Sequence, residues 1–183
     1  QDSARRHSRE VRGRLRRGEA VNILVVSGSR ALRRTPAARV WSLAQITASM
    51  NHDRAEAVAH GGCPDSPDDW CERLALLAGL TRVCWPIEGF PFVAPASGRM
   101  RPVADADRYP YEGPLRRNAA MARWAGDLLR AGHDVRALAL RCDWPLREGE
   151  RATQGTANCR ERLIEALGAE RVMDLACPKE HGP

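Results

Sequence analysis

The feature that most constrains this chain is an apolar run at residues 21–26 that leads directly into a glycine-containing turn. The run Val21-Asn-Ile-Leu-Val-Val26 is rich in β-branched residues, and Ser27-Gly28-Ser29-Arg30 follows it at once. A short continuous apolar run that ends in a turn is typical of a strand buried on both faces of a parallel sheet. The next segment, residues 36–50, has apolar residues at helical spacing behind Pro36. These segments predict a strand, a loop and a helix, which is the first half of a βαβ unit.

The same order recurs along the chain. Further strands are predicted at residues 55–60, 81–85, 134–140 and 171–176, and further helices at 67–79, 115–131 and 156–167. Strands that alternate with helices are typical of a parallel sheet covered on both faces. We therefore predict an α/β fold, a Rossmann-like three-layer sandwich with a mostly parallel sheet of about five strands. The proline-rich segment 87–112 shows no period and is expected to be either a lid or a flexible excursion.

Charge divides the chain into three parts. The net charge is +6, and residues 1–20 contribute +4 of it through seven arginines set against Asp2, Glu10 and Glu19. We predict a basic N-terminal arm at 1–20, a Rossmann-like domain at 21–176 and a polar tail at 177–183. Residues 5–17 of the arm are candidates for nucleic-acid contact through phosphate groups. The alternative is a solvated helix or tail, and the absence of aromatic residues argues against single-strand binding by base stacking.

Composition bears on location and on metals. The longest apolar runs fall well short of the roughly 20 residues that a membrane helix needs, and no secretory signal is visible. We therefore expect a cytoplasmic protein with no membrane partner. The six cysteines form no CxxC pair, and structural zinc sites usually draw on such pairs. Free thiols, no metal and no cofactor are the expectation.

Three loops that leave strand ends carry groups suited to phosphate. They are Ser27-Gly28-Ser29-Arg30, His60-Gly61-Gly62 and Gly155-Thr156, the last of which opens a helix. Glycine lets the backbone approach a ligand, arginine offers a bidentate cation, and free amides at a helix start bind anions. In doubly wound sheets, ligands bind beyond the carboxyl ends of the strands where the strand order switches. The first and fourth strands are expected to flank that point, so their loops are expected to face each other.

The start of the helix after the proline-rich segment adds further groups. Arg116, Arg117 and Asn118 stand near the positive end of a helix dipole, a placement that is easier to explain if an anion lies between them. Neither GxGxxG nor GxxxxGK[ST] is present, so the site is neither the dinucleotide fingerprint nor a P-loop.

Taken in order, these motifs resemble the YspA-like branch of the SLOG superfamily, which also contains the Lonely Guy phosphoribohydrolases and the DprA-type DNA-processing proteins. The resemblance covers roughly residues 21–176 and rests on Ser27–Arg30, His60-Gly61-Gly62-Cys63-Pro64 with Asp68, Gly113-Pro114 with Arg117, Asn118 and Met121, and Gly155-Thr156. It implies a Rossmann-like fold that binds nucleotides or nucleotide-derived ligands. By the same analogy a homodimer is expected.

The chain departs from that family at the positions that would carry hydrolysis. The usual Gly-Ala-Asp after the HGG loop is Ser66-Pro67-Asp68, so only the aspartate is kept. Hydrolytic relatives carry PGGxGTxxE, whose glutamate is needed to break the N-glycosidic bond. Here the preceding glycines are missing and Cys159 stands at the glutamate position, while Glu161 would point about 200° away on the helix. A thiol cannot replace that carboxylate.

Three functions follow from these residues. The first is binding or sensing of a nucleotide-type phosphate ligand, without turnover. The second is a phosphoribohydrolase-like N-glycosidase acting on nucleoside monophosphates, with Asp68 and Arg117 as candidate catalytic residues, although an Asp at a helix start is often only a cap. The third is a nucleic-acid-associated module that uses the arm. The candidate ligand-binding residues are Gly28, Ser29, Arg30, His60, Gly61, Gly62, Arg117, Asn118, Gly155 and Thr156.

Overall fold

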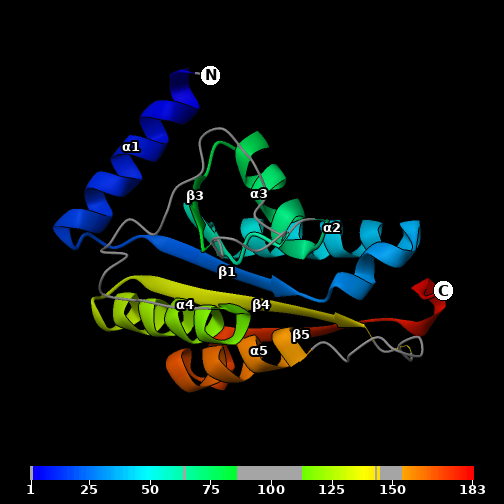
Figure 1. Ribbon diagram of the computed structural model, residues 1–183. Coiled ribbons are helices and arrows are strands. Elements are labelled where there is room, and N and C mark those ends of the chain that lie inside the picture. The colour runs from blue at the N-terminus through cyan, green and yellow to red at the C-terminus, as the bar shows by residue number, and fades with distance from the viewer. Residues whose placement is uncertain (1, 64, 86–112, 143, 145–153) are drawn as a thin grey trace.

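The computed structural model, which describes residues 2–63, 65–85, 113–142, 144 and 154–183, contains one sheet of five parallel strands. The strand order is β3-β2-β1-β4-β5 (Figure 1). The strands are β1 (Asn22–Gly28), β2 (Ala57–His60), β3 (Thr81–Cys84), β4 (Asp134–Cys142) and β5 (Val172–Cys177). The predicted α/β fold with a parallel sheet is confirmed. The segment 87–112, for which a lid was one expectation, lies outside the described residues.

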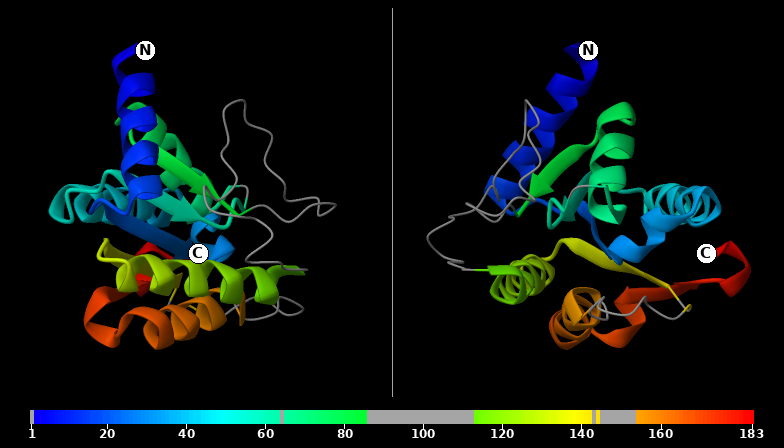
Figure 2. Two further views of the ribbon diagram at one scale, coloured as in Figure 1. Left: turned by 90° about the vertical axis from the view of Figure 1, so that its left-hand side faces the viewer. Right: turned by 45° about the vertical axis from the view of Figure 1, so that its right-hand side comes forward.

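Helices cover both faces of this sheet (Figure 2). Two helices, α2 (Pro36–His52) and α3 (Pro67–Leu77), lie on one face, and α4 (Gly113–Arg130) and α5 (Gln154–Leu167) lie on the other. An N-terminal helix, α1 (Asp2–Arg17), and three short 3-10 helices, η1 (Arg30–Arg34), η2 (Ala169–Arg171) and η3 (Lys179–His181), complete the elements. None of the helices in the described ranges is long and apolar enough to cross a membrane.

The central strand β1 is apolar from Ile23 to Val26 because both of its faces are buried there. Ile23 and Val25 belong to the core beneath α4 and α5, whereas Leu24 and Val26 belong to the core beneath α2 and α3. Side chains alternate between the faces of a strand, so a strand covered on both sides needs an apolar residue at every position. This is the physical reason for the continuous apolar run at residues 21–26.

Two helices on the α2–α3 face begin with the same pair of signals. Thr35 caps α2 by accepting a hydrogen bond from the Ala38 amide at 3.1 Å, and Pro36 follows it. Ser66 caps α3 by accepting from the Asp68 amide at 3.3 Å, again with a proline at the first helical position. A hydroxyl at the cap satisfies a backbone donor that has no partner inside the helix, and proline fits the position after it.

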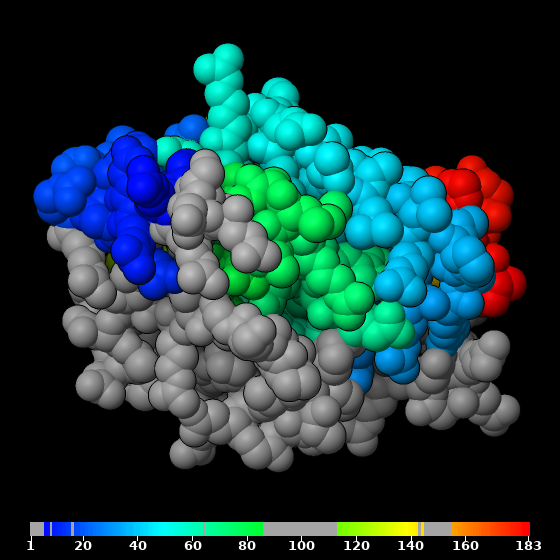
Figure 3. Space-filling model, turned by 90° about the horizontal axis from the view of Figure 1, so that it is seen from above, coloured from blue at the N-terminus to red at the C-terminus, as the bar shows by residue number. Residues whose placement is uncertain are grey.

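The arginine-rich segment is a helix that packs against the body of the protein. α1 contacts β3, and its Val11 is only 1% exposed within the core that also contains residues of α4 and α5. Leu15 packs against the same core, and Arg14 forms an ion pair with Glu56. Figure 3 shows α1 at one end of the face that α3 and α2 form. The inner half of the arm is thus part of the folded unit.

One strand extends further than its sequence pattern suggests. The apolar pattern of β4 stops at Leu140, but pairing with β5 continues through Arg141 and Cys142, which lie opposite Ala176 and Cys177. Because a charged residue at a strand end can reach solvent, hydropathy alone does not mark where backbone pairing stops. This extension brings Arg141 to the carboxyl edge of the sheet.

Candidate functional site

The carboxyl edge of the sheet has its switch point between β1 and β4. These strands are neighbours at the centre of the sheet, with β2 and β3 on one side and β5 on the other. The turn after β1 is held to β4 by a hydrogen bond from the Ser29 amide to the Leu140 carbonyl at 2.8 Å. The expectation that the first and fourth strands flank the switch point is therefore confirmed, and ligands of such sheets bind at this crevice.

Arg117 and Asn118 connect two of the loops that the sequence singled out. The Arg117 guanidinium donates through Nη1 to the Gly61 carbonyl at 2.5 Å, and through Nε and Nη2 to Asn118 Oδ1 at 3.2 and 3.0 Å. Asn118 then donates through Nδ2 to the Gly155 carbonyl at 2.9 Å. The start of α4 thus joins the β2 loop to the start of α5. We call Gly61, Asp68, Arg117, Asn118 and Gly155 the Arg117 cluster.

Three glycines at this edge leave space for other protein groups. A Cβ atom at Gly61 would lie 2.3 Å from Arg117 Nη1, and one at Gly28 would lie 2.2 Å from Cγ of Pro67. Real Cβ atoms do not approach other heavy atoms this closely, so a side chain at either position would push its neighbour away. Gly28, which the sequence suggested for approach to a ligand, therefore also serves the packing of α3. Gly62 has a φ of +69°, a conformation that glycine adopts without strain.

Asp68 is a buried carboxyl beside Arg117. Burial raises the pKa of Asp68, while the positive charge of Arg117, the neighbouring His60 and hydrogen bonds from the Cys63 and Gly61 amides oppose that rise. The Cys63 amide donates to Asp68 Oδ2 at 3.4 Å. Because Ser66 caps α3, Asp68 is not the cap of that helix. Its carboxyl lies instead against the loop after β2.

Cys159 lies close to the Arg117 cluster on the α5 side. Its thiol interacts with the Ser27 side chain and is influenced by the charges of Arg117 and Asp68. Burial raises the pKa of Cys159 to about 11. Cys159 therefore faces the cluster, where it supplies a neutral, buried thiol. Glu161 is exposed.

His60 fixes the conformation of its own loop. Its Nδ1 accepts a hydrogen bond from the Gly62 amide at 3.1 Å, and its Nε2 lies 3.3 Å from Glu72 Oε2. Arg82 Nη1 lies 3.4 Å from the other oxygen of Glu72. A ring nitrogen that accepts from an N–H carries no proton, so the ring proton belongs on Nε2, facing the carboxylate. His60 is buried within the protein and holds the Gly61-Gly62 loop in place from the α3 side.

The donor atoms of His60, Glu72 and Cys84 lie within 4.8 Å of one another and are the one such group of metal-ligand types among the described residues. A metal on His60 Nε2 would require the ring proton on Nδ1, where the Gly62 amide already points. Two donors cannot face each other in this way. The geometry favours a close His60–Glu72 pair, with Nε2 and Oε2 3.3 Å apart, over a metal site.

The Gly-Ser-Arg turn continues into the 3-10 helix η1, which the sequence pattern did not reveal. Ser29 is buried and caps η1, since its Oγ accepts from the Ala31 amide at 3.2 Å. Arg30 is exposed, and its positive charge partly opposes the rise that burial causes in the pKa of the Cys63 thiol. Ser29 therefore shapes the turn, whereas Arg30 stands near the loop after β2.

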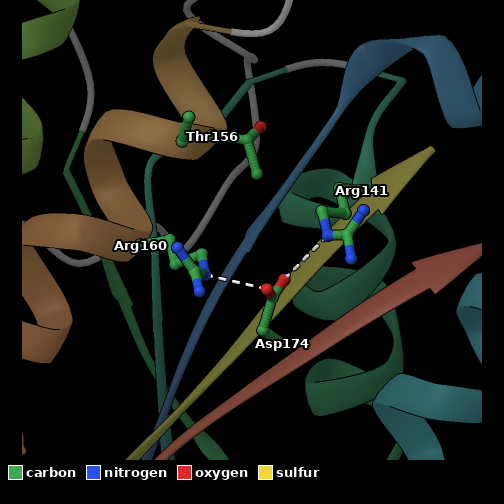
Figure 4. A pocket seen from close by; sticks show the side chains of 5 residues that line it. Arg141, Thr156, Arg160 and Asp174 are labelled. Carbon is green, nitrogen blue, oxygen red and sulfur yellow. Dashed lines mark hydrogen bonds and ion pairs between the residues drawn. The ribbon is translucent and has the colours of Figure 1, made fainter. Parts of the chain in front are cut away.

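A pocket of about 300 Å³ lies beside the start of α5. It is lined by Arg141, Thr156, Ala157, Arg160 and Asp174 (Figure 4). The Asp174 carboxylate forms ion pairs with both arginines. Its Oδ1 lies 3.3 Å from Arg141 Nε, and its Oδ2 lies 2.8 Å from Arg160 Nε. We call this the Thr156 pocket. Thr156 was among the sequence candidates, but the other residues were not.

The two halves of the candidate site meet at residues 155 and 156. Gly155 belongs to the Arg117 cluster and Thr156 to the pocket. A Cβ at Gly155 would meet nothing within 4 Å, so the backbone there has open space beside it. The structure thus brings Gly61, Arg117, Asn118 and Gly155 into one hydrogen-bonded chain. His60 and Ser29 are buried, and each stabilises the loop in which it lies. Comparisons with models of protein families, with curated proteins and with solved structures found no match to this chain.

Proposed function

We propose that this protein binds a nucleotide, or a phosphate-bearing ligand derived from one, at the carboxyl edge of the sheet, with the phosphate in the Thr156 pocket. The observation that carries the proposal is the set of Arg141, Thr156 and Arg160 in an open pocket at the start of α5. Two guanidinium groups share the single carboxylate of Asp174. The lining thus contains two positively charged residues and one negatively charged residue, and guanidinium groups bind phosphate strongly.

The start of α5 strengthens this positive potential. The first amides of a helix have no partner inside it, and the helix dipole places partial positive charge at this end. The Thr156 hydroxyl lies in the same first turn and can donate to a phosphate oxygen. Arginine groups that are already oriented by a carboxylate lose less side-chain freedom when an anion binds.

The Arg117 cluster would line the proposed ligand site between the pocket and the β2 loop. Its hydrogen bonds fix the separation of Gly61 and Gly155, and Arg30 stands near the β2 loop on the other side of the switch point. A phosphate in the pocket would leave the remainder of a nucleotide to extend along this edge. The ordered motifs that resemble the YspA-like branch support the same placement.

The proposal is tested by thermal shift and isothermal calorimetry with nucleoside mono-, di- and cyclic phosphates and with inorganic phosphate. A ligand that binds the folded state alone raises its unfolding midpoint. Arg160→Gln should lower the apparent affinity for these ligands at least tenfold, since it removes a charged partner of the phosphate. Arg162→Gln is the matched control, because Arg162 lies two positions away on α5, is exposed and pairs with Glu165. Equal binding by both variants would reject the pocket.

A second pair of variants tests whether the ligand reaches the β1 turn. Arg30→Ala should weaken binding of nucleotides more than that of inorganic phosphate, since Arg30 lies away from the pocket. Arg33→Ala, an exposed arginine of the same 3-10 helix, is the control. If both variants bind the whole panel as the unaltered protein does, the β1 turn has no part in the site.

A second candidate function, cleavage of the N-glycosidic bond of a nucleoside monophosphate, is favoured by Asp68. It is a buried carboxyl whose pKa is raised and which lies beside Arg117, as a general acid requires. Incubation with nucleoside monophosphates, followed by chromatography for the free base, tests it. Release of base that is lost in Asp68→Asn would establish turnover, and binding without release would leave a ligand-binding protein.

A further inference from the structure

Two cysteines stand opposite each other where β4 and β5 end. Cys142 is the last residue of β4, Cys177 is the last residue of β5, and the two are register partners in parallel strands. Neighbouring strands lie roughly 4.8 Å apart, and disulfides usually join residues whose Cα atoms are roughly 4.4–6.8 Å apart. Both side chains contribute to the core on the α2–α3 face, so they project to the same side of the sheet.

These two thiols differ in exposure. Cys142 is half-buried, whereas Cys177 is completely buried. An oxidant in solution can therefore reach Cys142 first, and Cys177 needs no solvent access to react with it afterwards. Within the described parts of the chain, no other two cysteines are register partners, since Cys84 lies opposite His60 and the remaining three cysteines lie outside the strands.

We propose that Cys142 and Cys177 are a redox modification site that forms a reversible intramolecular disulfide when the protein meets a peroxide. In the first step the Cys142 thiolate attacks the peroxide, which is reduced to water, and a sulfenic acid forms on Cys142. In the second step the Cys177 sulfur attacks that sulfenic sulfur, a second water leaves with the Cys177 proton, and the S–S bond forms. Two thiols are oxidised by one peroxide, and a dithiol reductant reverses the change.

This bond would form at the edge of the sheet that carries the candidate site. Cys142 Sγ lies 3.9 Å from Ser29 Oγ in the turn after β1, and Arg141 of the Thr156 pocket is its chain neighbour. The disulfide would tie the end of β5 to β4 and would change the contact with Ser29. Its formation depends only on the strand register and not on the proposed ligand.

Peptide mapping of the protein tests the proposal directly. Trypsin places the two cysteines in separate peptides, residues 142–147 and 172–179, each with a single cysteine. After treatment with hydrogen peroxide and alkylation of the remaining thiols, we expect a linked pair of these peptides whose mass lacks two hydrogen atoms, and which dithiothreitol separates. Folding of every sample is checked by circular dichroism.

Matched variants complete the test. Cys142→Ser and Cys177→Ser should each abolish the linked pair, whereas Cys63→Ser, which removes the other half-exposed thiol among the described residues, should leave it unchanged. The proposal is overturned if the unaltered protein shows no linked pair, if either peptide is joined to one containing Cys63 or to a second chain, or if Cys142 proceeds to sulfinic acid alone.

Discussion

Asn118 allows the structural account of the Arg117 cluster to be tested by stability alone. Asn118→Ala removes an acceptor of two hydrogen bonds from the Arg117 guanidinium and a donor to the Gly155 carbonyl. A hydrogen bond to a charged group contributes about 1.5–3 kcal/mol, and a neutral one about 1 kcal/mol. Gly155 is exposed, so water can replace its lost partner. The two bonds from Arg117 end on the same oxygen and are counted as one charged interaction, so the expected loss is about 2–3 kcal/mol in the free energy of unfolding.

Urea unfolding and thermal melts measure this loss. For a domain of this size, about 1 kcal/mol corresponds to a shift of roughly 2–4 °C in the unfolding midpoint, so a fall of about 4–12 °C is expected. Asn51→Ala is the control, because Asn51 is exposed in α2 and its replacement brings a similar gain in helix propensity. That variant should stay within about 0.5 kcal/mol of the unaltered protein. An equal result for both variants would refute the bridging role of Asn118.

Three further outcomes are expected. Because the pKa of Cys159 is about 11, only about one Cys159 thiol in ten thousand is ionised at neutral pH. Iodoacetamide should therefore label the half-exposed Cys63 first, and Cys159 should react only in urea. Labelling of Cys159 in the folded protein would contradict its burial. Burial raises the pKa of Asp68 above its ordinary value of 3.8, so the folded state binds this proton more tightly than the unfolded chain, and the contribution to stability is largest below that value and falls as pH rises. Asp68→Asn should accordingly flatten the decline in unfolding midpoint above about pH 4, whereas a parallel curve would show that burial has no such effect. On the nucleic-acid alternative, Arg6→Glu with Arg9→Glu should reduce retention of duplex DNA at low salt, since both arginines are exposed on α1; unchanged retention would exclude this face of the helix.

The design of the last experiment depends on a feature that charge counting did not reveal. Deleting the arm would remove Val11 and Leu15 from the core, and a loss of binding would then be hard to separate from a loss of stability. Substituting surface arginines avoids this. The sequence did carry the relevant signal, because Val11 and Leu15 are four residues apart and so share one face of a helix.

Much of the fold could be predicted because its elements follow local rules. The continuous apolar run of β1 reflects burial on both faces, and the serine, threonine and proline pairs at residues 35–36 and 66–67 mark helix starts. The order of the strands, with β1 beside β4, follows from the general topology of doubly wound sheets. These signals depend on residues close together in the chain.

The Thr156 pocket could not be predicted in the same way. Its acidic member, Asp174, lies opposite Ala139 in the sheet, so its approach to Arg141 and Arg160 depends on the register of β4 and β5. Ser29 shows a second limit, because its hydroxyl looked suited to a ligand but caps η1. Residue type identified what chemistry was present, whereas packing determined which groups face the edge.

A crystal structure of the protein with a nucleoside monophosphate tests the central proposal most directly. We predict a phosphate group within hydrogen-bond distance of the Thr156 hydroxyl and the Arg160 guanidinium, with the nucleoside extending along the edge toward the Arg117 cluster. A ligand that binds elsewhere on the protein, or a pocket that stays empty at millimolar nucleotide while the crystals remain intact, would contradict the proposal.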